Sequence, residues 1–144
     1  MIFFKTREMT GRVGVRLEKA GDQAELVHGD VRQSFRDKVR SGFRKGKFEI
    51  LVATDVAARG IDVDDVEAVF NYDLPDKQEF YVHRICRTGR AKRAGVSFSF
   101  VSFRDSIRMD EILKYIDSKP ISLVFDDFGT LCYKADGTPF LETA

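Results

Sequence analysis

Short apolar runs alternate along the chain with longer segments in which apolar residues recur every three or four positions. The short runs are rich in β-branched and aromatic residues, which favours strands at residues 2–4, 24–27, 49–53, 66–71 and 96–101. The longer segments have the spacing of amphipathic helices, at residues 8–20, 33–45, 77–87 and 105–116. This regular alternation predicts an α/β fold, a three-layer αβα sandwich with a mainly parallel sheet.

The C-terminal stretch follows a different pattern. Apolar runs at residues 121–125, 131–134 and 138–141 are separated by short polar segments, and the last two flank Asp136-Gly137. An Asp-Gly pair between apolar runs predicts a β-hairpin. We therefore expect one domain over residues 1–119 and an extension, residues 120–144, that forms a strand and hairpin packed on it.

Composition limits the class of protein. The chain has 144 residues, of which 43% are hydrophobic and 33% charged, and this is typical of one globular domain with a core of its own. Its two cysteines, Cys86 and Cys132, lie far apart without metal-ligand spacing, which favours a reducing compartment and no metal site. The apolar runs are too short for a membrane span or a signal peptide, so we expect a cytoplasmic protein.

Charge is balanced overall, with 24 Lys and Arg against 23 Asp and Glu, but it is unevenly distributed. Basic residues outnumber acidic ones in the first 60 positions, and residues 83–93 hold several basic side chains and no acid. Such local density indicates an anionic partner, although a solvated basic face gives the same composition. Thr88-Gly89 interrupts the run as a shaped loop would, which favours the functional interpretation.

Ligands of parallel sheets bind at the carboxyl ends of the strands, so the loops after Phe4, His28, Thr54 and Tyr72 are the candidate binding loops. After the second strand, the amides of Gly29 and Asp30 could hold a phosphate oxygen while Arg36 neutralises it. Gln33 lies one helical turn before Arg36 and faces the same way.

A self-contained catalytic site is missing from the sequence. The segment closest to a phosphate-binding P-loop, residues 42–48, is one residue too short and ends in Phe rather than Ser or Thr. No apolar strand ends in an Asp-Glu pair that could hold Mg²⁺.

Four segments resemble motifs of one family. Residues 2–6 (IFFKT) resemble motif IV, the Gln33/Arg36 pair the QxxR motif, residues 53–62 (ATDVAARGID) motif V, and residues 83–90 (HRICRTGR) motif VI. Over roughly residues 1–103 the chain resembles the second RecA-like domain of a DEAD-box ATP-dependent RNA helicase of superfamily 2. The resemblance implies a RecA-like fold.

The resemblance also implies roles for single residues. Arg87 and Arg90 match the arginine fingers that reach the γ-phosphate, and His83 matches the residue that couples the nucleotide to the RNA site. Asp62 matches the residue that contacts the ATP ribose. The positions on the RNA-backbone side are Gly29, Gln33, Arg36, Thr54 and Asp55, together with Lys5 and Thr6. Cys86 departs from the pattern, because the family usually has Gly at that position.

On this basis the chain is expected to be half of an RNA helicase. It would close on a P-loop domain that holds most of the ATP and Mg²⁺, and it would be inactive alone because the P-loop and DEAD motifs are absent. The alternatives are a stand-alone or truncated RNA-binding module and, less favoured, a DNA helicase of superfamily 2. The first strand begins at Met1, so we also expect self-association, or residues 121–125 covering the apolar face beside that strand.

Overall fold

Five parallel strands form the central sheet of the structure, a computed structural model that describes residues 1–29, 31–89 and 94–140. Their order across the sheet is β2-β3-β1-β4-β5, so β1 lies in the middle. Each neighbouring pair is parallel, as predicted. The strands are β1 (Ile2–Phe4), β2 (Ala24–Val27), β3 (Ile50–Thr54), β4 (Ala68–Asn71) and β5 (Val96–Ser99).

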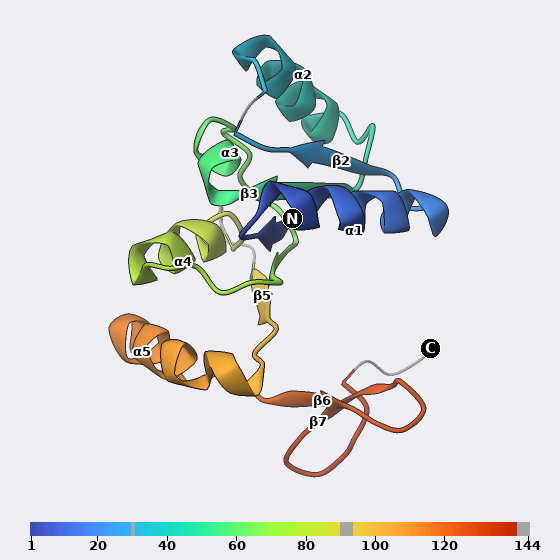
Figure 1. Ribbon diagram of the computed structural model, residues 1–144. Coiled ribbons are helices and arrows are strands. Elements are labelled where there is room, and N and C mark those ends of the chain that lie inside the picture. The colour runs from blue at the N-terminus through green and yellow to red at the C-terminus, as the bar shows by residue number, and fades with distance from the viewer. Residues whose placement is uncertain (30, 90–93, 141–144) are drawn as a thin grey trace.

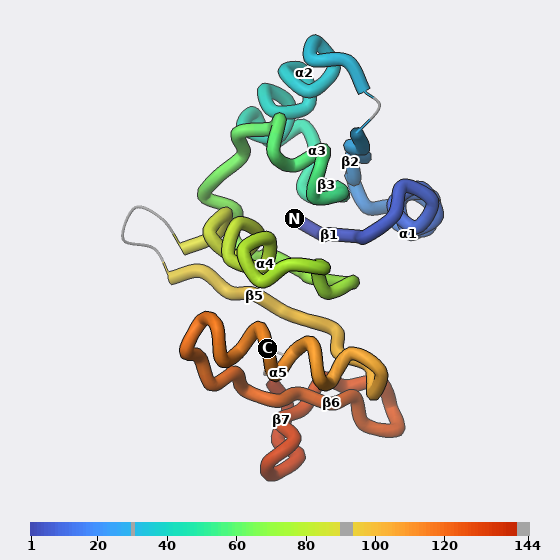
Figure 2. Tube along the Cα trace, turned by 60° about the vertical axis from the view of Figure 1, so that its left-hand side comes forward, coloured from blue at the N-terminus to red at the C-terminus, as the bar shows by residue number. Residues whose placement is uncertain are grey.

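Helices cover both faces of the sheet, as Figure 2 shows, and this confirms the predicted α/β sandwich. On one face α1 packs over β1, β2 and β3, with Gly14 against the Leu26 side chain. On the other face Phe3 and Leu51 join the core cluster that includes Val39 of α2 and Ala57 of α3. The helices are α1 (Arg7–Lys19), α2 (Gln33–Arg44), α3 (Asp55–Arg59), α4 (Gln78–Ile85) and α5 (Ser106–Ile116), and a 3₁₀ turn, η1 (Phe103–Asp105), precedes α5.

A row of aromatic rings lies on the same face of the sheet as α1 and extends from β1 to β5. Phe70 of β4 stacks on Phe98 of β5 with ring centroids 5.0 Å apart, and Tyr72 contacts both Phe4 and Phe100. Aromatic pairs of this kind add to the stability gained from area burial. The row therefore joins β1, β4 and β5 across this face of the sheet.

The C-terminal segment contains a small antiparallel hairpin, as expected, but its strands are β6 (Leu123–Phe125) and β7 (Leu131–Tyr133) rather than the two runs that flank Asp136-Gly137. Figure 1 shows it at the end of the molecule opposite α2. The loop at Asp126 joins the two strands, and the predicted Asp136-Gly137 turn follows, returning the chain to a bridge between Cys132 and Pro139.

The expectation that residues 121–125 cover the face beside β1 is wrong. Ile121 and Phe125 stay 70% and 63% exposed, and the ring contact between this extension and the sheet is made by Phe140, which meets Phe98 edge-on. The physical reason is topological, because β1 already pairs with β3 and β4 on its two sides while the chain leaves the sheet at the β5 edge. Self-association remains a prediction.

No helix among the described residues has both the length and the apolar composition needed to cross a membrane.

Candidate functional site

The candidate site lies at the carboxyl ends of the strands, where α3 begins directly after β3. Thr54 ends β3 and caps α3, because its Oγ1 accepts a hydrogen bond from the Ala57 amide at 3.4 Å. The Thr54 side chain is buried among its neighbours, and residue 55 already belongs to the helix. The cap fixes the direction in which Asp55 leaves the sheet.

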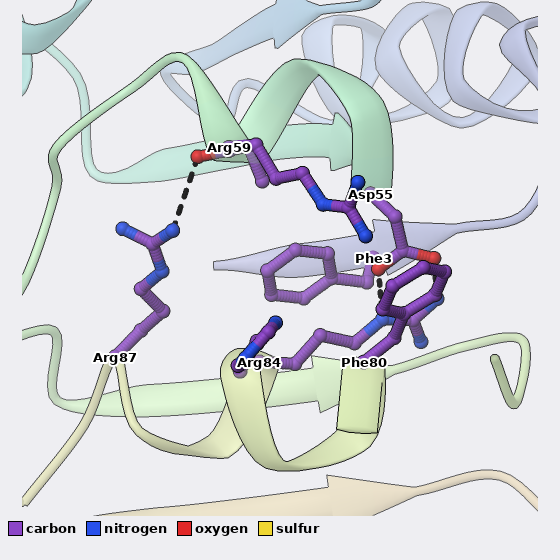
Figure 3. Close-up of a pocket in the computed structure, with 8 residues that line it drawn as sticks. Phe3, Asp55, Arg59, Phe80, Arg84 and Arg87 are labelled. Atoms are coloured by element: carbon purple, nitrogen blue, oxygen red, sulfur yellow. Dashed lines mark hydrogen bonds and ion pairs between the residues drawn. The ribbon is translucent and has the colours of Figure 1, made fainter. Parts of the chain in front are cut away.

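Asp55 and Arg84 form a bidentate ion pair between α3 and α4. Nε and Nη2 of Arg84 donate to the two carboxylate oxygens of Asp55, both at 2.7 Å, as Figure 3 shows in part. Nη1 of Arg84 donates to the Asp73 carbonyl at 2.6 Å and to Asn71 Oδ1 at 3.3 Å. Arg84 is only 1% exposed, so its charge is compensated by bonded acceptors rather than by water.

Arg87, the predicted arginine finger, lies two residues after the end of α4. Its side chain binds the end of α3 and the loop that follows it. Its Nη1 donates to the carbonyls of Ile61 and Val63, and its Nη2 donates to the carbonyl of Ala58 at 3.1 Å. The Asp64 carboxylate lies 3.6 Å from Nη1. The guanidinium thus spans both sides of residue 62 and holds motif V against motif VI.

Asp62 itself points to solvent, with a side chain that is 69% exposed and 3.9 Å from Arg44 Nη2. His83 of α4 is also exposed, and it lies four residues before Arg87 in the sequence. Figure 3 shows the small pocket between α3 and α4, in which Arg59 lies over the Phe80 ring, 4.3 Å from its centroid. A guanidinium on an aromatic face is held in place without losing its charge.

On the neighbouring side of the edge, Arg36 of α2 is brought to the loop after β2. Its Nη2 donates to the Gly29 carbonyl at 3.2 Å, while its Nε is buried and has no hydrogen-bond partner among the described residues. Gln33, one turn earlier, donates to Asp37. Gly60 lies against Arg36 so closely that an added Cβ would overlap the guanidinium. The QxxR segment and motif V are therefore in direct contact.

Lys5 and Thr6 follow β1 at the same edge. Thr6 caps α1 by accepting from the Met9 amide, and Lys5 Nζ pairs with the Asp76 carboxylate at 2.7 Å. The hydrogen bond from Lys5 holds the pKa of Asp76 below its ordinary value. The backbone amide of Lys5 donates to Asp73 Oδ2 at 2.8 Å.

The structure thus brings most of the predicted residues to one edge of the sheet, whereas Asp30 and Arg90 lie outside the described residues. Arg84 and Arg59 were not predicted from the sequence. Arg84 lies in a basic run of a kind that usually faces solvent. Its position three residues after Tyr81, however, places Tyr81 and Arg84 on the same, buried face of α4. That spacing was the available signal.

Besides the carboxylates of Asp55, Asp62, Asp64, Asp73 and Asp76, this edge holds guanidinium groups, amides and hydroxyls, which suit anions. Within the described ranges, no cluster of three or more His, Cys, Asp or Glu side chains is arranged to hold a metal ion. The groups fit phosphate oxygens, for which planar guanidinium is a strong donor.

Comparison with known proteins assigns these motifs to a family. Residues 1–92 match the model described as "Helicase conserved C-terminal domain". The chain is 41% identical over 140 residues to an ATP-dependent RNA helicase RhlB of Xanthomonas axonopodis, covering 96% of this chain and 24% of the relative. It is 42% identical over 131 residues to the ATP-dependent RNA helicase FAL1 of Vanderwaltozyma polyspora, covering 91% of this chain and 33% of that protein. The chain therefore spans about a quarter to a third of these relatives.

Solved structures give the same relationship. The C-terminal domain of the DEAD-box protein Dbp5 matches with a TM-score of 0.76 and 37% identity, covering 82% of this chain and 70% of that one. A DEAD box protein from Methanococcus jannaschii matches with a TM-score of 0.76 and 42% identity, covering 82% of this chain and 32% of that one. The RecA-like fold expected from the motifs is thus confirmed.

Proposed function

Because the chain belongs to the helicase conserved C-terminal domain family and is the C-terminal domain of a DEAD-box RNA helicase, we propose that it closes on a P-loop first domain. Closure completes an ATP pocket on one side and an RNA-backbone groove on the other. ATP hydrolysis is thereby coupled to RNA duplex unwinding. We also propose a reducing, cytoplasmic location, in which the free thiols of Cys86 and Cys132 would persist.

The observation that carries the proposal is the contact between Arg87 and the backbone on both sides of Asp62. It supports a nucleotide-facing surface in which the candidate ribose ligand and the candidate finger come from one rigid unit. A guanidinium suits a phosphoryl-transfer transition state, because charge is spread over several oxygens there. His83 would lie beside the finger at the mouth of the pocket. Arg90 completes the set by its position in the motif.

The first domain would hold most of the ATP and its Mg²⁺, which neutralises charge on the phosphates when bound. This chain would contribute Arg87, Arg90 and His83 to catalysis and Asp62 to nucleotide binding. The RNA side would consist of the Gly29 and Asp30 loop, Gln33 and Arg36, Thr54 and Asp55, and Lys5 and Thr6. Both oxygens of Asp55 already bind Arg84, so its carboxylate would approach the RNA backbone as a neutralised group.

The catalytic half is tested by fusing the chain to the P-loop domain of a related helicase and measuring RNA-stimulated ATP hydrolysis. Arg87→Ala is expected to lower kcat on the order of 10³-fold with a much smaller change in ATP affinity, as for arginine fingers. Arg87→Lys should restore little, because a point charge cannot replace the planar fork. Arg12→Ala, which removes an exposed pair on α1, is the control. Near-normal turnover of Arg87→Ala, or ATP hydrolysis by the chain alone, would contradict the proposal.

The RNA half is tested with the chain alone. If the Gly29 loop, Arg36 and Thr54 engage about three phosphates, the slope of log K against log salt should be roughly −2 for single-stranded RNA. Binding with this slope but no ATPase in the fusion would favour the stand-alone RNA-binding module. A slope of zero, or a strong preference for one base sequence, would argue against backbone recognition.

A further inference from the structure

Arg84 is the only charged residue that is fully buried among those described. A buried ion pair is a weak source of stability, because the cost of removing two charges from water offsets much of their attraction. Apolar side chains in place of both partners would fill the same space without that cost. The position of this arginine between the two halves of the candidate site suggests a role beyond stability.

The first contact of Arg84 is with the RNA-side segment at the start of α3. Asp55, its bidentate partner, directly follows Thr54, a candidate RNA-backbone residue. Thr54 is only 8% exposed and is held by its cap on α3, so it cannot move toward a phosphate without moving the start of that helix. Any such movement displaces the carboxylate that Arg84 grips.

The second contact is with the loop after β4, which in turn binds the RNA-side segment after β1. The Asp73 carbonyl accepts from Arg84 while the Asp73 carboxylate accepts from the Lys5 amide. Phe3, two residues before Lys5, lies under the guanidinium, with its ring centroid 5.0 Å from Cζ. Two of the segments that carry candidate RNA ligands are therefore linked to one side chain, residues 54–55 directly and residues 5–6 through Asp73.

The nucleotide-side residues are attached to the same element. His83 is the neighbour of Arg84 on α4, and Arg87 follows it by about one helical turn. We propose that Arg84 is a positioning residue that transmits the occupancy of these two RNA-side segments, residues 54–55 and 5–6, to α4, and so to His83 and Arg87. The inference rests on the proposed function, because it assigns the RNA and nucleotide sides as above.

The test uses the ¹⁵N-labelled chain, titrated with a single-stranded uridine decanucleotide and followed by nuclear magnetic resonance. In the wild type, saturation with RNA should shift the amide signals around Thr54 and Gly29 and also those of His83 to Thr88. In Arg84→Lys, the first set of shifts should remain and the second should be lost. Asp55 is itself a candidate RNA ligand, so in Asp55→Asn the RNA is added until the Gly29 signals saturate, and the signals of His83 to Thr88 should then stay unshifted. Asp55→Asn is nearly isosteric, so it keeps the test valid if Arg84→Lys does not fold.

The controls are Glu8→Gln and Arg12→Lys, which make the same kinds of substitution in an exposed ion pair of α1. Both should respond to RNA as the wild type does. RNA binding without any response of α4 in the wild type would overturn the inference alone, as would an undiminished α4 response in folded Asp55→Asn. Absence of RNA binding by the wild type would overturn the RNA half of the proposed function and the inference with it.

Discussion

Asp55 and Asp126 each accept two hydrogen bonds, but from very different places in the chain. Asp55 binds Arg84, 29 positions away, and the bonds join two helices across the site. Asp126 binds the amides of Phe128 and Thr130, two and four positions away, and the bonds only shape its own turn. The site region is therefore ordered by contacts that require the whole fold, while the C-terminal hairpin is ordered mainly by its own turns.

The largest effect is expected from replacing Arg84, the central side chain of the site region. Arg84→Met leaves buried Asn71 and the partly buried Asp55 carboxylate and Asp73 carbonyl without their donor. We therefore expect a loss of about 3 kcal/mol in the free energy of unfolding, the lower end for breaking a buried pair. Urea denaturation monitored by circular dichroism measures it. Arg12→Met is the control and should change stability little. An equally small loss of stability in Arg84→Met would contradict the dependence of the site region on long-range contacts.

A smaller effect is expected where the hairpin meets the sheet. Phe140→Ala removes the edge-on contacts with Phe98 and Tyr133, so we expect a loss of about 1 kcal/mol in stability. Thermal unfolding of the whole chain measures it, with exposed Phe128→Ala as the control. A loss as large as that of Arg84→Met would mean that the hairpin is part of the main core.

The smallest effect concerns the turn at Asp136. Hydrogen bonds from the Thr138 amide and then its hydroxyl hold the pKa of Asp136 below its ordinary value of 3.8. Because the folded pKa is lowered, this carboxylate stabilises the turn above pH 3.8, and the contribution is lost as the pH falls through the folded pKa. An NMR pH titration should show a midpoint below 3.8, and Thr138→Val should raise it partway. A midpoint at or above 3.8 in the wild type would contradict the local bonding.

The same contrast explains which features could be predicted. The strands of the sheet and the four longer helices could be predicted from the apolar spacing to within about two residues, because a helix and a strand each bury side chains at a fixed period. The carboxyl-end loops follow from the parallel topology. The carbonyl contacts of Arg87 could not be predicted, because backbone acceptors leave no trace in the identity of residues 58, 61 and 63.

Other features escaped for related reasons. Arg84 resembles a surface residue by type, and its burial depends on Asp55 arriving from a distant segment. The place of residues 121–125 depended on which edge of the sheet the chain leaves, and the apolar pattern alone does not encode this. The division at residue 119 stays a prediction.

The closeness of Gly60 to Arg36 has a consequence for how this sequence can vary. An alanine at position 60 would meet the tip of a flexible side chain rather than backbone, so the fold can accept it if Arg36 swings away from the Gly29 carbonyl. Substitutions at the two positions are therefore not independent. Among natural homologues, we expect a side chain at position 60 to appear together with a shorter residue at position 36.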